Sequence, residues 1–251
     1  KASKKILTIS GIKSLFIPPG PGDESVSLGA AYCLIKEKLN KKTKISNMIN
    51  PYVGTKFDLE IFKEHLKLKK IKFKNVSAKY IAKLLNYGEP IARFSTEPSE
   101  FGPRALGNRS IIASPKNQQI INHINESIKI RDFWMPFAPS VIEPEFKKLF
   151  IEKKKSFPFF MTTSHDSTIF ARKQIPAALH PFDRTARPQL VKKQVNKKYF
   201  MLINEFKKIS GVGCLLNTSF NIHGEPIVNS PKDALDVFYR TKLKYLLIDN
   251  I

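Results

Sequence analysis

Apolar residues recur at three- and four-residue intervals in several stretches of the chain, which is the spacing of one face of an α-helix. Residues 58–68 carry Leu59, Phe62 and Leu66 at this spacing, and residues 118–128 repeat isoleucine in the same way. Further helices are predicted at 23–39, 76–85 with Ser77 as its cap, 145–150, 197–210 ended by Gly211, and 231–239 with Pro231 in its first turn.

Short apolar runs bounded by Pro, Gly or polar residues predict strands between these helices. They lie at 11–17, 88–95, 139–144, 159–162, 213–217 and 245–248. Residues 40–54 are polar and contain Pro51 and Gly54, which predicts a connector. The alternation of strands and helices from about Asn75 to the end predicts an α/β or α+β domain.

The chain is strongly basic. Its 251 residues include 43 Lys and Arg against 21 Asp and Glu, a net charge of +22. Such an excess can mark a nucleic-acid-binding protein. The lysines are spread along the whole chain, however, and do not alternate with aromatic residues in a stacking pattern. We therefore expect a solvated basic surface that attracts anionic substrates, and we disfavour nucleic acid as a partner.

Hydrophobic residues make up 42% of the sequence, enough for one substantial core, or a smaller core with an appendage. No apolar run approaches the roughly 18 residues of a membrane helix, and no signal-peptide pattern stands at the start, so no membrane partner is expected. Lys1 in place of Met indicates that the chain begins inside a longer protein. Cys33 and Cys214 lie in apolar surroundings, which predicts buried thiols in a reducing compartment such as the cytoplasm.

Arginine is scarce: it supplies eight of the 43 basic residues, and two of these stand in the turn-forming stretch 100–110. Guanidinium groups bind phosphate or carboxylate oxygens bidentately, whereas an ammonium group acts as a point charge. Gly102 and Gly107 would let the backbone bring Arg104 and Arg109 close to a ligand. The alternative is that both arginines form salt bridges that hold a surface loop in place.

Two pairs of polar residues share a spacing of two positions, Lys129 with Arg131 and Ser219 with Asn221. In an extended segment this spacing puts both side chains on one face. Two cations, a hydroxyl and a carboxamide can together bind a triphosphate. We therefore expect the two pairs to form one site, with a solvated charge pair as the alternative for Lys129 and Arg131.

Several longer stretches lie in the order found in one known family. The stretches 100–110, 129–131, 135–140, 180–189 and 215–228 resemble the C-terminal half of the O-carbamoyltransferase family of nodulation-factor and antibiotic biosynthesis. This resemblance is collinear from about Tyr80 to Ile251. Residues 16–31 resemble the last conserved segment of the N-terminal, actin-like catalytic domain of the same family.

The resemblance implies two domains. Residues 1–74 would be a remnant of the actin-like carbamoyl-transfer domain with its connector, and residues 75–251 a YrdC-like carbamoyltransferase C-terminal domain. A YrdC-like domain implies a twisted mixed sheet with flanking helices, whose concave face holds the ligand.

The resemblance also implies a reaction. ATP and carbamoyl phosphate would give carbamoyl adenylate and pyrophosphate, with release of phosphate, and the full-length enzyme would transfer the carbamoyl group to a hydroxyl of a sugar or another small metabolite. Mg²⁺ would bridge the ATP phosphates, and catalysis would rest on positioning and charge neutralisation. The residues matched to binding of ATP and carbamoyl phosphate are Arg104, Arg109, Ser110, Lys129, Arg131, Arg187, Thr218, Ser219 and Asn221, with Lys129, Arg131 and His180 as catalytic residues.

Some of these roles have structural alternatives. His180 could orient a ligand, act as an acid or base, or serve as a structural hydrogen bonder, and His223 is equally open. By the resemblance, Asp23 helps the actin-like domain to bind iron or another divalent metal, with upstream ligands that this sequence lacks. Alternatively, Asp23 caps the helix predicted to begin there.

The sequence departs from the family pattern at two positions. Met135 stands where the family often has Arg, and Arg184 stands where many members have Gly, which suggests a divergent subgroup. Two other functions stay open, a basic RNA-binding YrdC-like module and a nucleotide-binding regulatory domain without turnover. An oligomeric state also stays open.

Overall fold

The computed structural model describes residues 2–38, 50–129, 135–152 and 155–251. Arg131 and Trp134 lie outside this part of the chain. The helices are α1 (Ala2–Ile6), α2 (Val26–Lys38), α3 (Leu59–Leu68), α4 (Ala78–Asn86), α5 (Gln119–Ile124), α6 (Phe146–Leu149), α7 (Ile169–Gln174), α8 (Lys197–Ser210) and α9 (Pro231–Tyr239). The strands are β1 (Ser14–Leu15), β2 (Ile91–Phe94), β3 (Arg109–Ala113), β4 (Ala138–Ile142), β5 (Phe150–Ile151), β6 (Lys155–Ser156), β7 (His165–Ser167), β8 (Thr185–Ala186), β9 (Gln189–Val191), β10 (Cys214–Ser219) and β11 (Tyr245–Ile248).

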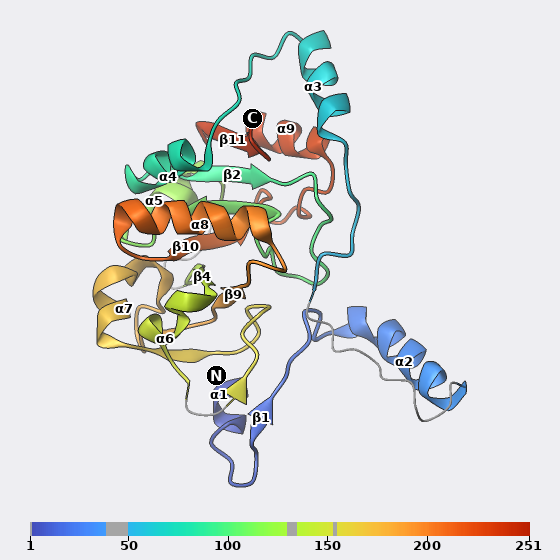
Figure 1. Ribbon diagram of the computed structural model, residues 1–251, viewed down its shortest axis with the longest axis vertical. Helices are drawn as coiled ribbons and strands as arrows, with labels where there is room; N and C mark the ends of the chain where they lie inside the picture. Colours follow the sequence, from blue (N-terminus) through green and yellow to red (C-terminus); the bar gives the residue numbers. More distant parts are fainter. Residues whose placement is uncertain (1, 39–49, 130–134, 153–154) are drawn as a thin grey trace.

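A six-stranded mixed sheet forms the centre of the protein, in the order β11-β2-β3-β10-β4-β9 (Figure 1). The pairs at its two edges, β11 with β2 and β4 with β9, are parallel, and the inner pairs are antiparallel. Ser219 pairs with Ser110 of β3, and Asn217 pairs with Ala138 of β4. The end of β10 therefore lies beside the starts of β3 and β4. Several of the predicted site residues lie at this end of the three strands.

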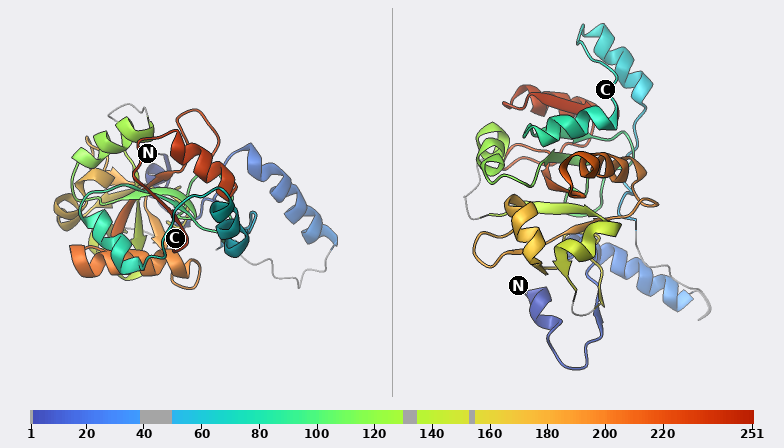
Figure 2. Two further views of the ribbon diagram at one scale, coloured as in Figure 1. Left: turned by 90° about the horizontal axis from the view of Figure 1, so that it is seen from above. Right: turned by 60° about the vertical axis from the view of Figure 1, so that its left-hand side comes forward.

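Helices cover both faces of the sheet. Because side chains alternate along a strand, Ile111 of β3 packs into the cluster that contains α5 and α9, whereas Ile112 packs into the cluster that contains α4 and α8. Two further views show the helices on either side of the strands (Figure 2). This mixed sheet with flanking helices confirms the predicted α/β class.

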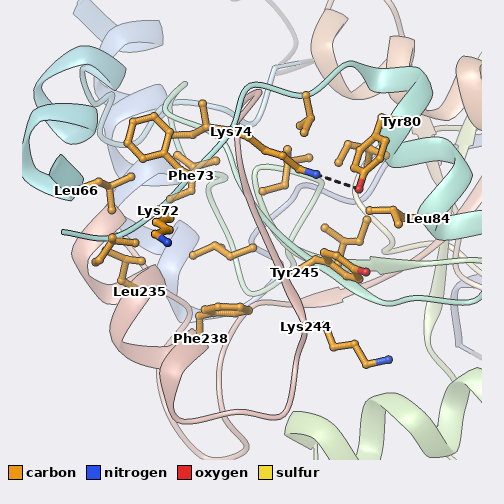
Figure 3. Close-up of a pocket in the computed structure, with 18 of the residues that line it drawn as sticks. Leu66, Lys72, Phe73, Lys74, Tyr80, Leu84, Leu235, Phe238, Lys244 and Tyr245 are labelled. Atoms are coloured by element: carbon orange, nitrogen blue, oxygen red, sulfur yellow. Dashed lines mark hydrogen bonds between the residues drawn. The ribbon is translucent and has the colours of Figure 1, made fainter. Parts of the chain in front are cut away.

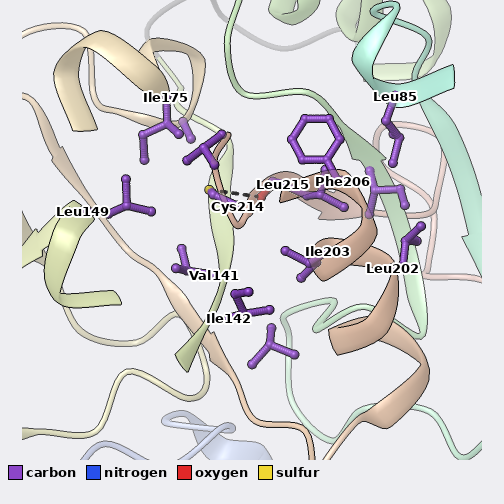
Figure 4. Close-up of a cluster of buried hydrophobic side chains, with 14 of the residues drawn as sticks. Leu85, Val141, Ile142, Leu149, Ile175, Leu202, Ile203, Phe206, Cys214 and Leu215 are labelled. Carbon is purple, nitrogen blue, oxygen red and sulfur yellow. Dashed lines mark hydrogen bonds between the residues drawn. The ribbon is translucent and has the colours of Figure 1, made fainter. Parts of the chain in front are cut away.

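The core on the α8 side is dense and apolar (Figure 4). Ile203 and Phe206 of α8 are fully buried against Leu85 of α4 and Leu215 of β10. Cys214 is also fully buried, as predicted, and burial raises the pKa of its thiol far above the ordinary range. Helix α8 ends where the sequence predicts, because Gly211 takes a φ of 82° at its C-cap.

Other predicted elements need correction. The strand expected at 159–162 is absent: Met161 takes a φ of 58° in a turn, and Phe160 and Met161 are buried against Leu106. Strand β3 was missed, since its residues follow directly on the turn-forming stretch at 100–107. Helix 118–128 is split, because α5 ends at Ile124 and a π-helical turn, η2 (Asn125–Lys129), follows.

Helix α2 extends away from the sheet (Figures 1 and 2). It has no buried residue, and Cys33, predicted to be buried, is exposed. The burial prediction for Cys33 is therefore wrong in this chain. Leu34 and Ile35 are exposed on the same helix. Because apolar residues occur on all sides of α2, this helix has the pattern of one that is buried inside a protein.

The predicted connector and the segment after it pack on the sheet domain. Tyr52 forms a β-bridge with Glu100, and the Tyr52 hydroxyl donates to the Leu106 carbonyl at 2.7 Å. Phe62 and Leu66 of α3 are buried in the cluster on the α9 side. Residues 50–73 therefore contribute to the same fold as the residues after 75. Within the described ranges, no helix has the length and apolar character needed to cross a membrane.

Candidate functional site

A cavity of about 700 Å³ lies at the edge of the sheet where β10 ends. We call it the large cavity. Its described lining residues are Arg104, Lys129, Met135, Pro136, Phe137, Ala138, Ser164, Ala178, His180, Asp183, Thr185, Ala186, Arg187, Asn221, His223 and Gly224. They include three of the predicted cations, so sequence positions more than 80 residues apart converge on one cavity. Its volume is within the usual range for small-molecule sites.

Lys129 is almost fully buried, with 1% of its surface exposed. Its ammonium group donates to the Ser219 hydroxyl at 3.2 Å, and to the backbone and side-chain oxygens of Asn221 at 2.8 and 2.5 Å. Ser219 in turn donates to the Asn221 side chain at 2.7 Å. The structure thus brings together Lys129 and the Ser219–Asn221 pair, as the sequence predicts.

The placement of Lys129 has a local cause. It ends the π-helical turn η2, rather than lying in the extended segment that the spacing argument assumed. π-Helical turns inside or after α-helices are frequent at functional sites. Ser127 and Ile128 in this turn are buried as well, so the backbone before Lys129 is held by packing.

Arg104 lies in the loop that joins β2 to β3. Its side chain is exposed to the cavity and has no hydrogen bond or ion pair with the described residues. Glu100 organises this loop, because its Oε1 accepts from the backbone N–H groups of Leu106, Asn108 and Arg109 at 2.7, 2.7 and 3.3 Å. This role of Glu100 was not predicted from the sequence.

A small cavity of about 50 Å³ adjoins the large one and shares Arg104, Arg187 and Phe137 with it. We call it the small cavity. Thr218 and Ser219, both predicted site residues, line it from the end of β10, together with Asn217. Arg187 reaches both cavities because it stands between β8 and β9, beside the end of the sheet.

His180 belongs to a tight turn at the rim of the large cavity. Its Nδ1 accepts from the backbone N–H groups of Phe182 and Asp183 at 3.3 and 3.4 Å. The side chain of Asp183 accepts from the N–H and the hydroxyl of Thr185, at 3.0 and 2.7 Å. The same Nδ1 lies 3.4 Å from Asp183 Oδ1. With Nδ1 as the acceptor of the two backbone N–H groups, the ring proton is on Nε2 and can be donated to a ligand in the cavity.

Two predicted site residues lie elsewhere. Arg109 is 1% exposed, and its guanidinium group donates to the carbonyls of Ser95 and Asn229 and stacks on Phe94 at 3.9 Å. Ser110 is fully buried, and its hydroxyl accepts from the Gly107 N–H at 2.9 Å. Neither lines the two cavities, so the expectation that they contact the ligand needs correction. Burial lowers the pKa of Arg109 to about 10.

Asp23 is exposed at the start of a short 3₁₀ turn, η1 (Asp23–Ser25), ahead of α2. The capping position of this turn is Gly22 and no side-chain capping bond forms there, so Asp23 does not act as the helix cap of the alternative interpretation. Across the described ranges, no group of three or more His, Cys, Asp or Glu could hold a metal ion. The described residues therefore supply no metal site around Asp23 by themselves, and the site expected there depends on the upstream ligands that the family resemblance implies.

A third cavity, of about 300 Å³, lies against β11 (Figure 3). Its lining is mostly apolar, with Leu66, Phe73, Leu235 and Phe238 inside and lysines at its rim. It contains none of the predicted site residues, so it is not the site indicated by the sequence motifs.

Residues 82–251 match the model of a family described as the carbamoyltransferase C-terminus. The chain belongs to this family. Nodulation protein NolO of Bradyrhizobium diazoefficiens is 32% identical over 256 residues, which is 97% of this chain and 45% of that protein. Nodulation protein NolNO of Sinorhizobium fredii is 33% identical, over 97% of this chain and 36% of that protein.

An uncharacterized protein of Methanocaldococcus jannaschii is 36% identical over 94% of this chain and 39% of its own length. The chain thus spans less than half the length of these relatives. One departure from the family pattern has a structural consequence: Arg184 takes a φ of 56°, a conformation that favours the glycine expected there.

Proposed function

We propose that this chain is the part of a carbamoyltransferase that activates carbamoyl phosphate with ATP. The product would be carbamoyl adenylate, for transfer to a hydroxyl of a sugar or another small metabolite by the full-length enzyme. Membership of the carbamoyltransferase C-terminus family supports the carbamoyl chemistry. The observation that carries the proposal is the convergence of Arg104, Lys129 and Arg187 on one cavity of about 700 Å³.

The proposed reaction has two steps. Water cleaves carbamoyl phosphate into carbamate and phosphate, and a carbamate oxygen then attacks the α-phosphorus of ATP. The bond from that phosphorus to the bridging oxygen breaks, and pyrophosphate leaves with the electron pair. Carbamate is a weak electrophile, and adenylation gives its carbon a good leaving group.

The cationic side chains would neutralise the phosphates and fix their positions, which is where catalysis of such transfers mainly arises. Lys129 donates its ammonium hydrogens to Ser219 and Asn221, and it would exchange one of these bonds for a bond to a triphosphate oxygen. Arg104 and Arg187 line the same cavity and would bind phosphate oxygens. The Nε2–H of His180 would donate to a phosphate oxygen instead of acting as a general base. Arg131, which lies outside the described residues, remains a proposed phosphate ligand.

Mg²⁺ would accompany ATP and be held mostly by the phosphates themselves, as is usual for this ion. We also propose that residues 1–38 belong to the actin-like transfer domain of a longer protein. The exposed apolar residues of α2 would pack inside that domain, and Asp23 would join upstream residues at its iron or other divalent metal.

Pyrophosphate release tests the proposal. The purified chain would be incubated with ATP and Mg²⁺, with and without carbamoyl phosphate, and pyrophosphate would be measured by a coupled assay. We expect release that requires both substrates and is lost in the variant Lys129→Met. Absence of release, or release at the same rate without carbamoyl phosphate, would contradict the proposed activation and favour a binding domain without turnover.

A further inference from the structure

A chain of buried hydrogen bonds ends at Asn217, which lies near the end of β10 and lines the small cavity. The Asn217 amide nitrogen donates to the Ala105 carbonyl at 3.1 Å and to the Ser140 hydroxyl at 3.0 Å. Ser140 donates to Gln189 Oε1 at 2.7 Å, and Gln189 Nε2 donates to the Leu106 carbonyl at 2.6 Å. Because the Ala105 carbonyl can only accept, the Asn217 nitrogen must face it, and the orientation of the amide is fixed.

This orientation leaves the Asn217 amide oxygen without a donor. Asn217 is 2% exposed, and within the described part of the chain its Oδ1 has no hydrogen-bond partner. A buried acceptor left in this state costs about 1–3 kcal/mol. Such groups are exceptional in native proteins, and a ligand donor is one explanation for them.

Asn217 lines the small cavity, next to Arg104 and Arg187. The volume of about 50 Å³ can hold a group of a few heavy atoms, because a single water requires about 10–15 Å³ by the same measure. The ligand that fits this combination carries a small N–H donor beside an anionic group. The carbamoyl end of carbamoyl phosphate has this chemistry.

We propose that Asn217 is a specificity-determining residue: its Oδ1, which is closed off from the small cavity in this structure, accepts a hydrogen bond from the amino group of a carbamoyl compound once the ligand enters that cavity. This inference rests on the proposed function and assigns the part of the substrate that the small cavity recognises. Arg104 and Arg187 take the adjoining phosphate, while Asn217 distinguishes an amino group from a methyl group of similar size.

The physical basis is the cost of an unpaired polar group. Acetyl phosphate has the same carbonyl and phosphate as carbamoyl phosphate, but it carries a methyl group in place of the amino group. With acetyl phosphate bound, Oδ1 stays buried and without a donor. Sites built to hydrogen-bond an N–H or O–H group reject analogues that lack it.

Calorimetric titration tests this assignment. Carbamoyl phosphate, acetyl phosphate and inorganic phosphate would each be titrated into the wild-type chain and into the variants Asn217→Leu and Ser140→Ala. We expect the wild type to bind carbamoyl phosphate about tenfold or more tightly than acetyl phosphate. Asn217→Leu should bring this ratio close to one, mainly by weakening carbamoyl phosphate, and leave inorganic phosphate binding in place.

Ser140→Ala is the matched control, because it removes an equally buried partner of the network but retains Oδ1. We expect it to keep the preference for carbamoyl phosphate, whatever its effect on stability. Circular dichroism checks the fold of each variant, and the wild-type ratio stands as evidence even if Asn217→Leu does not fold.

The outcomes separate the two proposals. Wild-type binding of both acyl phosphates with equal affinity, or an unchanged ratio in Asn217→Leu, overturns the role of Asn217 and leaves the proposed function in place. Failure of the wild type to bind carbamoyl phosphate at all overturns the proposed function, and the assignment of Asn217 with it.

Discussion

Arg93 and Arg109 explain, at the scale of single residues, why a lysine-rich chain retains a few buried arginines. The Arg93 guanidinium donates to the Gly107 carbonyl and lies 5.1 Å from the centre of the Tyr199 ring. Arg109 binds the carbonyls of Ser95 and Asn229 while stacking on Phe94. A planar guanidinium group can donate hydrogen bonds to several carbonyls at once, which an ammonium group cannot do in the same geometry. Burial lowers the pKa of Arg93 as well.

The substitution Arg109→Lys should therefore act on stability and not on ligand binding. We expect the free energy of unfolding to fall by about 1–3 kcal/mol, because buried carbonyls lose charged hydrogen bonds. Urea denaturation measures this loss, and ATP titration of the folded variant should give the wild-type affinity. Arg172→Lys, at a largely exposed arginine, is the control with little expected change. Unchanged stability with lost ATP binding would restore Arg109 to the site.

Some residues of the candidate site could be predicted from the sequence and others could not, for a physical reason. Lys129, Ser219 and Asn221 were identified together, because their residue types and spacing already suggest an anion site. Arg109 has the same side chain as Arg104 and stands five residues away, yet its guanidinium group donates to the backbone carbonyls of Ser95 and Asn229. Which of two neighbouring arginines lines the large cavity depends on the strand that begins at Arg109, and this strand was not predicted.

At the scale of elements, the end of β11 is joined to β2 and α8 through one carboxylate. The Asp249 side chain, 5% exposed, accepts from the Ser95 hydroxyl at 3.0 Å and pairs with Lys198 at 3.2 Å. Burial alone would raise the pKa of Asp249. The hydrogen bond from Thr96 and the positive charge of Lys198 outweigh burial and hold this pKa below its ordinary value.

This lowered pKa predicts how stability depends on pH. Asp249 contributes its full stabilisation above its unfolded-state pKa, about 3.9, and loses it as the pH falls through the lower folded-state pKa. We expect Asp249→Asn to be less stable than wild type by about 1–3 kcal/mol at neutral pH. Urea denaturation from pH 7 downwards should show this difference shrinking in acid. A difference that is constant or grows in acid would contradict the assigned cause.

The loop between β2 and β3 depends on a close approach at Gly107. Gly107 takes a φ of 116°, and a Cβ atom there would lie 2.4 Å from the Tyr199 ring. We expect Gly107→Ala to lower the unfolding temperature and to weaken ATP binding, because the displaced loop also carries Arg104. Gly211→Ala is the matched control, since Gly211 also has a positive φ but a Cβ atom there would meet nothing within 4 Å. Equal losses of unfolding temperature and ATP binding in the two variants would show that the positive φ, and not the contact with Tyr199, causes the effect.

Elements were predicted well where the sequence contains a local signal. Helices α4, α8 and α9 have a cap, an ending glycine or a first-turn proline that the sequence shows directly, at Ser77, Gly211 and Pro231. Strand β3 has no such signal, because its pairing with β2 and β10 is made by residues distant in sequence. The exposure of α2 depends on which partner surface is present, and local sequence does not contain that information.

At the scale of the whole molecule, the net charge of +22 raises the question of nucleic acid. The described site places its cations inside a cavity and not along a flat groove with stacked aromatics. We expect single-stranded RNA to bind weakly, to dissociate between about 50 and 200 mM salt, and not to displace ATP. Fluorescence anisotropy with labelled RNA measures this. Salt-resistant binding that competes with ATP would favour the RNA-binding alternative.

The large cavity is the proposed binding site for the ATP triphosphate, and Lys129 is the most buried cation among its described lining residues. Calorimetric titration of Mg²⁺ and ATP into wild type and Lys129→Met tests this directly. Lys116→Met is the control, since Lys116 donates to the Ser210 carbonyl and does not line the cavity. We expect Lys129→Met to weaken ATP binding about tenfold to a hundredfold, because a hydrogen bond to a charged group contributes about 1.5–3 kcal/mol, and Lys116→Met to leave it unchanged. Equal ATP affinity in wild type and in folded Lys129→Met would contradict the proposed site.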